Sequence, residues 1–297
     1  MSFSSDVKAE LCKQSISRYA VALAEVYGAL LYCNTFSAWE VRVITGNTAF
    51  AERLPKLVKK AFALNFDEIS DAADKRRSFV ITDRKKIEKI FAAYGYDANS
   101  VLSHHINLSV LEEADSASAF IRGAFLAGGS ITNPAKGYHL ELVTDHQSVS
   151  RETVSILQEM GFEPKTASRS GHYITYFKQS EIIEDLFTLL GAPISAMEIM
   201  SAKVEKDMRS AVNRRVNCDN ANADKIVSAA FEQLEAIRRL DISALPEKLR
   251  ETAQLRINNP EFSLADLAGL CNPPVTKSCM SHRLRKLASL AEEKGIE

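Results

Sequence analysis

The sequence repeats itself once, and this repeat limits the possible folds more than any other feature of the chain. Three short matches recur in the same order at an offset of 95 or 96 residues: Gly28-Ala29-Leu30-Leu31 with Gly123-Ala124-Phe125-Leu126, Leu64-Asn65-Phe66-Asp67 with Met160-Gly161-Phe162-Glu163, and Ile87–Phe91 with Ile183–Phe187. One such match would be noise, whereas three in order with a one-residue slip indicate two copies of one unit. We place the copies at about 17–95 and 116–191.

Both copies have the same expected content of helices and strands, because helical and strand periodicities alternate in the same order. The expected helices cover 17–34, 48–64, 84–94, 116–128, 147–160 and 180–190, and the expected strands cover 39–45, 78–82, 138–143 and a pair around 168–171. The first helix of each copy carries small residues, Gly28-Ala29 and Gly123-Ala124, which allow close backbone approach. We therefore expect these two helices to pack together, so that one chain forms a pseudo-dimer.

The last forty residues have the pattern of a helix-turn-helix. Ser263 and Asp266 have the spacing of a capping box that starts a short helix, and Pro273-Pro274 then prevents its continuation. A second helix is expected to start near Thr276. Its apolar positions have the spacing of one buried stripe, which consists of Met280, Leu284, Leu287, Ala288 and Ala291.

The other face of this second helix is basic. From Val275 to Leu290 there are four Lys or Arg residues, one His and no Asp or Glu, whereas 221–297 as a whole is balanced between acids and bases. Such segregation favours a nucleic-acid site, because a helix in a major groove faces phosphates, although a solvated surface helix is the plainer alternative. The candidate DNA-binding residues here are Ser263, Thr276, Lys277, Ser278, Ser281, His282, Arg283, Arg285 and Lys286.

A helical linker is expected between the duplicated region and the helix-turn-helix. Met197 to Arg215 reads as a basic helix, and a second helix reads from Asp224, with a polar turn between them. Arg214 and Arg215 complete the set of candidate DNA-binding residues, because they can pair with phosphates, although the position slightly favours the alternative, in which they complement a helix C-terminus. The asparagines at 217, 220 and 222 fit turn capping better than base readout.

Composition excludes several classes of protein. The chain has 297 residues, of which 46% are hydrophobic and 25% charged, so we expect an ordinary soluble protein with room for two cores. There is no apolar run of membrane-spanning length and no signal peptide, which predicts a cytoplasmic protein with no membrane contact. The five cysteines form no C-x-x-C pair, the histidines lack ligand-spaced partners, and phosphate-loop and nucleophile motifs are absent. We expect no metal, no cofactor and no enzymatic activity.

The segment Ile121–Gly129, with the fainter Val26–Asn34, resembles the interface helix of LAGLIDADG homing endonucleases. That resemblance implies two helices whose last motif position holds Mg²⁺ through a carboxylate at the centre of a DNA-binding cleft. Those positions are Cys33 and Gly128 in this sequence, and neither side chain offers the oxygen ligands that a hard cation needs. The resemblance therefore predicts the fold without the cleavage chemistry.

A duplicated LAGLIDADG-like domain followed by a helix-turn-helix resembles the WhiA family of sporulation and cell-division regulators. The likeness rests on Ser2–Lys8, Gly123–Ile131, Asn213–Asn222, Lys277-Ser278 and His282–Lys286. The implied fold is α+β, with a degenerate LAGLIDADG-like domain at 1–195, a helical linker at 196–220 and an all-α helix-turn-helix domain at 221–297.

The family implies a sequence-specific DNA-binding transcription regulator, tied to cell division, chromosome segregation or sporulation. The expected partners are double-stranded promoter DNA and a protein co-regulator bound through the LAGLIDADG-like domain. We expect a monomer associated with the nucleoid. The rival hypotheses are a degenerate metal-dependent nuclease and a division-associated scaffold that binds protein partners.

Overall fold

The computed structural model describes residues 2–72, 76–98 and 103–293, and the chain forms two compact units. Unit 1 is Met1–Lys206 and unit 2 is Asp207–Glu297. Each unit has its own apolar core. In the described part of the chain, no helix combines the length and the apolarity that a membrane span needs.

The two copies in unit 1 have the same order of elements, which confirms the duplication. After α1 (Phe3–Leu11), the first copy consists of α2 (Tyr19–Leu31), β1 (Thr35–Phe36), β2 (Val41–Thr45), α3 (Thr48–Phe62), β3 (Glu68–Ala72), β4 (Arg76–Ile81) and α4 (Arg84–Ala93). After a 3₁₀ turn, η2 (Leu108–Leu111), the second copy consists of α5 (Ser116–Gly128), β5 (Gly129–Ile131), β6 (Leu140–Thr144), α6 (Gln147–Glu159), β7 (Lys165–Arg169), β8 (His172–Phe177) and α7 (Ser180–Leu190).

Each copy forms a four-stranded antiparallel sheet with the same topology. The strand orders are β1-β2-β4-β3 and β5-β6-β8-β7. In the first sheet Val41 pairs with Ile81 and Val43 with Phe79, so all four of these apolar side chains lie on the buried face. The edge strands β1, β3 and β5 were not predicted, because they are short or carry few apolar residues to set an alternation.

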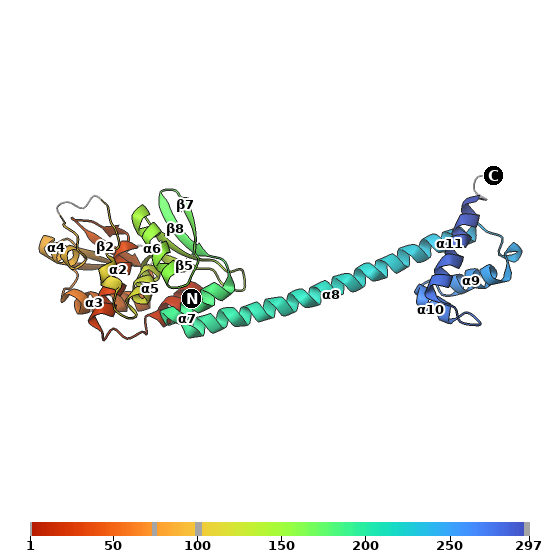
Figure 1. Ribbon diagram of the computed structural model, residues 1–297, viewed down its shortest axis with the longest axis horizontal. Helices are drawn as coiled ribbons and strands as arrows, with labels where there is room; N and C mark the ends of the chain where they lie inside the picture. Colours follow the sequence, from red (N-terminus) through yellow and green to blue (C-terminus); the bar gives the residue numbers. More distant parts are fainter. Residues whose placement is uncertain (1, 73–75, 99–102, 294–297) are drawn as a thin grey trace. The chain divides into compact units, whose positions relative to one another are not determined.

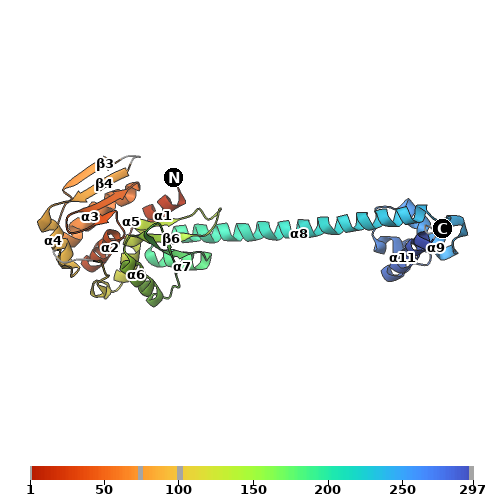
Figure 2. The ribbon, with the colours of Figure 1, turned by 90° about the horizontal axis from the view of Figure 1, so that it is seen from above.

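The helices α2 and α5 lie side by side in the middle of unit 1 (Figures 1 and 2), as the small residues predicted. A Cβ atom added to Gly28 would lie 1.9 Å from the carbonyl oxygen of Phe120, and one added to Gly123 would lie 1.9 Å from that of Glu25. Both backbones are therefore in contact at equivalent points of the two copies, which only glycine permits.

A buried ion triad lies beside this helix contact. The carboxylate of Glu25, on α2, is fully buried and lies between two guanidinium groups. Arg53 donates to it from Nε at 2.6 Å and from Nη2 at 2.9 Å, and Arg122 donates from Nε at 3.0 Å and from Nη2 at 2.8 Å. The side chains of Arg53 and Arg122 are only 6% and 7% exposed, so the triad holds one excess positive charge inside unit 1.

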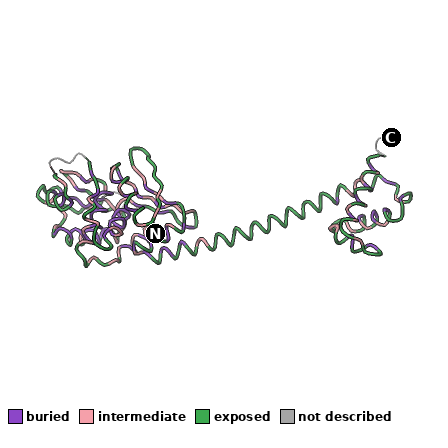
Figure 3. The backbone as a smooth tube through the Cα atoms, viewed as in Figure 1, coloured by how far each residue is buried: buried purple, intermediate pink, exposed green. Residues whose placement is uncertain are grey.

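The predicted polar turn in the linker is wrong. A single helix of 46 residues, α8 (Pro193–Arg238), runs through the whole segment, and its middle is exposed (Figure 3). No Gly or Pro occurs between Ile194 and Arg238. The asparagines lower helix propensity by no more than about 0.7 kcal/mol each, which does not end a helix. They are helical residues rather than turn caps, and Arg214 and Arg215 do not lie at a helix C-terminus.

Unit 2 is all helical, as predicted. The last turns of α8 are followed by a 3₁₀ turn, η3 (Ile242–Ala244), and by α9 (Glu247–Asn258), α10 (Leu264–Gly269) and α11 (Lys277–Glu293). Ile237 of α8, Leu249 of α9, Leu267 of α10 and Leu284 of α11 belong to one core. The three C-terminal helices therefore pack as one body around the end of α8.

Candidate nucleic-acid interface

The helix-turn-helix forms as the capping pattern predicted. The hydroxyl of Ser263 accepts the amide of Asp266 at 3.3 Å, and the carboxylate of Asp266 accepts the amide of Ser263 at 3.2 Å, which completes the capping box of α10. At the start of α11, the hydroxyl of Thr276 accepts the amide of Cys279 at 3.2 Å, as an N-cap side chain does. Two of the candidate DNA-binding residues, Ser263 and Thr276, thus cap the N-terminal starts of α10 and α11.

The predicted apolar stripe of α11 faces the core. Met280, Leu284, Leu287 and Ala291 are buried, and Ala288 is half-buried. The opposite side of the helix presents polar and basic side chains to solvent. The exposed members of the predicted set within α11 are Lys277, Ser278, His282, Arg285 and Lys286, with Ser281 half-buried beside them.

Within this exposed set, Arg285 donates from Nη2 to the hydroxyl of Ser281, one helical turn earlier, at 3.4 Å. The bond directs the guanidinium along the outer face of the helix. The outer face of α11 can therefore offer cations and hydroxyl donors to an anionic surface.

Arg283 lies on a different side of α11 from the exposed set. Its side chain is 14% exposed and its Nη1 lies 3.5 Å from a carboxylate oxygen of Glu251, on α9. The other oxygen of Glu251 accepts the amide of Asn272, in the turn between α10 and α11, at 3.1 Å. Glu251 thus ties the turn to α11, and we assign Arg283 a positioning role. No sequence pattern identifies Glu251, which lies 21 residues before Asn272.

Arg256, on α9, is a second positioning residue that sequence reasoning missed. Its side chain is 2% exposed, and its Nη1 donates to the carbonyl oxygen of Phe262 at 2.8 Å, directly before the cap of α10. Burial lowers the pKa of the guanidinium from its usual value, because the charged form is desolvated. The bond fixes the chain where it enters the helix-turn-helix.

Arg214 and Arg215 are exposed, but they lie in the middle of α8. Ile237, where α8 enters the core of unit 2, is 22 residues beyond Arg215 along the same helix. At 1.5 Å per residue this spacing is roughly 33 Å. The two arginines therefore form a basic site on α8 that is separate from the helix-turn-helix. A DNA contact by them stays a prediction.

At the ends of α2 and α5, where the resemblance places metal-binding carboxylates, this chain has Cys33 and Gly128. Burial raises the pKa of the Cys33 thiol to about 12, so this residue stays protonated and is a poor metal ligand. A Cβ atom on Gly128 would lie 2.5 Å from the carbonyl oxygen of Val143 and 2.9 Å from that of Tyr32. An acidic side chain does not fit at Gly128 without a shift of the backbone.

An ammonium group lies at the end of α5. Lys8, from α1, donates to the carbonyl oxygen of Leu126 at 3.1 Å and lies over the ring of Phe125. Burial lowers the pKa of Lys8 to about 8. A cationic side chain at a helix C-terminus complements the helix dipole and repels a divalent cation. Among the described residues, no group of three or more metal-ligating side chains comes together.

An acidic and a basic side chain lie side by side at the start of β2 and again at the start of β6 in unit 1. Arg42 donates from Nε to Glu40 at 3.1 Å at the start of β2, and His139 lies 3.3 Å from Glu141 at the start of β6, the equivalent strand. Each pair brings a basic and an acidic group to the same surface. Such a surface builds little positive potential, which backbone binding to DNA requires.

His104 has a structural role, as expected for the histidines. The ring is 7% exposed, stacks on Phe36 and bonds through Nε2 to the carbonyl oxygen of that residue at 2.7 Å. Burial, with the nearby His146 as a second cause, lowers the pKa of His104 to about 4. The ring is therefore neutral near pH 7 and binds the β1 segment to the loop before η2.

Comparison with known proteins decides the family. Residues 117–209 match the model of the WhiA LAGLIDADG-like domain, and residues 212–291 match that of the WhiA C-terminal HTH domain. A probable cell division protein WhiA of Clostridium perfringens is 36% identical over 310 residues, covering 99% of this chain and 98% of the relative. The chain belongs to the WhiA family. A WhiA relative of Clostridium acetobutylicum is 36% identical over 312 residues, with the same coverage.

Solved structures agree on the fold. The crystal structure of full-length DUF199/WhiA from Thermatoga maritima matches with a TM-score of 0.61 at 23% identity, and 99% of each chain is covered. The N-terminal LAGLIDADG domain of DUF199/WhiA matches with a TM-score of 0.52 at 19% identity, covering 64% of this chain and 92% of that one. The predicted fold class, a duplicated LAGLIDADG-like domain followed by a helical helix-turn-helix domain, is confirmed.

Proposed function

We propose that this WhiA-family protein is a sequence-specific DNA-binding transcription regulator that acts in cell division, chromosome segregation or sporulation. The observation that carries the proposal is the outer face of α11, where Lys277, His282, Arg285 and Lys286 are exposed on a helix whose opposite side is fixed in the core. A rigid helix with such a face suits a major groove. The Clostridium relatives are named probable cell division proteins, which supports the cellular role.

In this proposal, some residues of α11 contact DNA bases and others contact phosphates. Arg285 and His282 lie one to two turns into α11, where side chains of a recognition helix reach base edges. Lys277 lies at the helix N-terminus and Lys286 lies beside Arg285, both in positions suited to phosphates. Ser278 and Ser281 supply hydroxyl donors to the same surface.

Replacing Arg285 with alanine is expected to weaken binding to a target duplex by about 1–3 kcal/mol. Crosslinking of the full-length protein to chromosomal DNA supplies the target duplex, and fluorescence anisotropy with target and unrelated duplexes measures the loss. A loss confined to the target indicates base contact, and an equal loss on both indicates phosphate contact. Lys248→Ala, an exposed cation on α9, is the matched control. Wild-type affinity of Arg285→Ala for every duplex contradicts the proposed interface.

We propose further that unit 1 does not cleave DNA. This rests on the protonated thiol of Cys33, the lack of room for a side chain at Gly128 and the ammonium of Lys8 at the end of α5. Supercoiled plasmid incubated with the protein and Mg²⁺ or Mn²⁺ is expected to stay supercoiled. A linear or nicked product that disappears with a chelator, and that is absent with a Lys277 and Arg285 double alanine variant, would support the nuclease hypothesis instead.

The proposed role of unit 1 is to present a surface to a protein co-regulator. The charges at the start of β2 and β6 are paired within the chain, which disfavours duplex binding there and leaves that surface available for a protein. In this proposal the protein works as a monomer on the nucleoid, with unit 2 on DNA and unit 1 on the co-regulator.

A further inference from the structure

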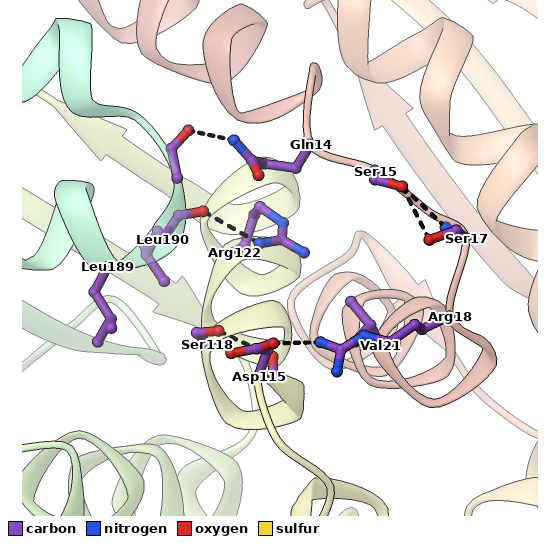
Figure 4. Close-up of a pocket in the computed structure, with 11 residues that line it drawn as sticks. Gln14, Ser15, Ser17, Arg18, Val21, Asp115, Ser118, Arg122, Leu189 and Leu190 are labelled. Atoms are coloured by element: carbon purple, nitrogen blue, oxygen red, sulfur yellow. Dashed lines mark hydrogen bonds and ion pairs between the residues drawn. The ribbon is translucent and has the colours of Figure 1, made fainter.

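A cavity of about 290 Å³ opens beside the N-terminal ends of α2 and α5 in unit 1 (Figure 4). Its walls come from the loop between α1 and α2, the first turn of α2, the first turns of α5 and the C-terminal end of α7. Among the polar residues that line it are Gln14, Ser17, Arg18, Asp115, Ser118 and Arg122. No element of the proposed DNA interface contributes to this cavity.

Hydrogen bonds between its walls hold the cavity open. Gln14 donates from Nε2 to the carbonyl oxygen of Gly191, at the end of α7, at 2.8 Å. Across the cavity, Arg18 at the start of α2 forms an ion pair with Asp115 at the start of α5. Figure 4 shows these contacts at opposite sides of Arg122. Because the bonds cross between elements, the site is formed before a ligand arrives.

The side chains around the cavity carry a net positive charge. Arg18 and Asp115 cancel each other, whereas the triad of Glu25, Arg53 and Arg122 keeps one excess positive charge. Arg122 donates three hydrogen bonds: two to Glu25 and one from Nη1 to the carbonyl oxygen of Leu190 at 3.1 Å. A guanidinium has five N–H groups, so Arg122 keeps donors for an oxyanion. A buried excess charge is costly until an anion approaches it.

The backbone adds to this preference for an anion. The N-caps of α2 and α5 are Arg18 and Asp115, and neither side chain caps its helix. Val21 in the first turn of α2 and Ser118 in the first turn of α5 line the cavity, so the positive ends of both helix dipoles lie beside it. These dipoles and the excess charge of the triad favour the same kind of ligand by independent means.

We propose that this cavity binds a small metabolite through an oxyanion group, a phosphate or a carboxylate. The volume suits a small molecule rather than a peptide or a nucleic acid. The bound oxyanion lies against Arg122, near the N-terminal turns of α2 and α5, and Ser17 and Ser118 line the space for the rest of the ligand. Unit 1 thereby carries a ligand site of its own, separate from DNA binding by unit 2.

Titration calorimetry of the full-length protein tests the site with inorganic phosphate and with succinate as separate probes, against sodium chloride at matched ionic strength. At least one probe is expected to bind with one-to-one stoichiometry at millimolar concentration. Saturation by phosphate alone assigns a phosphorylated ligand, and saturation by succinate alone assigns a carboxylate. If neither probe saturates the protein below roughly 50 mM, which corresponds to a binding free energy weaker than about 2 kcal/mol, the proposal fails.

Ser118→Asp and Ser148→Asp locate the bound probe. Both substitutions place a carboxylate in the first turn of a helix, where it is compatible with folding, but only Ser118 lines the cavity. Ser118→Asp is expected to weaken probe binding by at least about tenfold through like-charge repulsion, while Ser148→Asp binds as the wild type does. Equal binding by wild type and Ser118→Asp places the anion elsewhere and overturns the proposal.

Discussion

Gly123→Ala is expected to destabilise unit 1 by at least about 3 kcal/mol, because overpacking at a contact between two backbones has no side chain that can move aside. The new Cβ atom would lie 1.9 Å from the carbonyl oxygen of Glu25 and 2.9 Å from the amide nitrogen of Ala29. In an open helix the same change would instead stabilise by about 1 kcal/mol. The sign of the effect thus reports the contact between α2 and α5. Urea unfolding followed by circular dichroism measures it.

Gly137→Ala is the matched control for this change. A Cβ atom on Gly137 meets no atom within 4 Å, so the free energy of unfolding should change by less than about 0.5 kcal/mol. Gly28→Ala, at the equivalent point of the first copy, is expected to behave as Gly123→Ala does. If Gly123→Ala were as stable as the wild type, the close packing of α2 against α5 would be wrong.

Glu25→Gln is expected to cost about 3–5 kcal/mol of stability, because it leaves two buried guanidinium groups without a counter-charge. The substitution keeps the size of the side chain and removes only its charge. Both arginines donate to the carboxylate from Nε and Nη2 at 3.0 Å or less, so four charge-assisted hydrogen bonds weaken at once. The measurement is again urea unfolding of the full-length protein.

Asp115→Asn supplies the comparison for Glu25→Gln. It breaks the ion pair with Arg18, whose side chains are 52% and 70% exposed, and such exposed pairs contribute less than about 1 kcal/mol. Asp115 has a left-handed backbone, with φ at 66°, which asparagine also tolerates. A Glu25→Gln variant no less stable than Asp115→Asn would mean that the triad does not carry a buried charge.

The duplication and several element ends could be predicted from the sequence, because local patterns determine them. The bounds of α5 and α7 agree with the prediction, and Gly191 ends α7 in the left-handed conformation that favours glycine. The capping box of Ser263 and Asp266 starts α10 as predicted. In each case the determining residues lie within a few positions of the element that they define.

Features that depend on distant residues could not be predicted. Arg283 is a basic residue of the kind that binds DNA, but the direction of its side chain depends on Glu251, which is 32 positions away. The triad joins Glu25 to Arg122 across 97 positions, and no sequence period relates them. The continuity of α8 was missed for another reason: asparagine favours turns but does not impose one when Gly and Pro are absent.

Separate titration of the two units against one duplex at two salt concentrations tests the division of labour most directly. The fragment Asp207–Glu297, which has its own core, is expected to retain most of the affinity of the full chain and its dependence on salt. Each phosphate contact contributes about 0.9 to the slope of log K against log salt. The fragment Met1–Lys206 is expected to bind weakly, because the basic groups at the start of β2 and β6 are paired with acids. Equal or tighter binding by Met1–Lys206 would contradict the assignment of DNA recognition to α11.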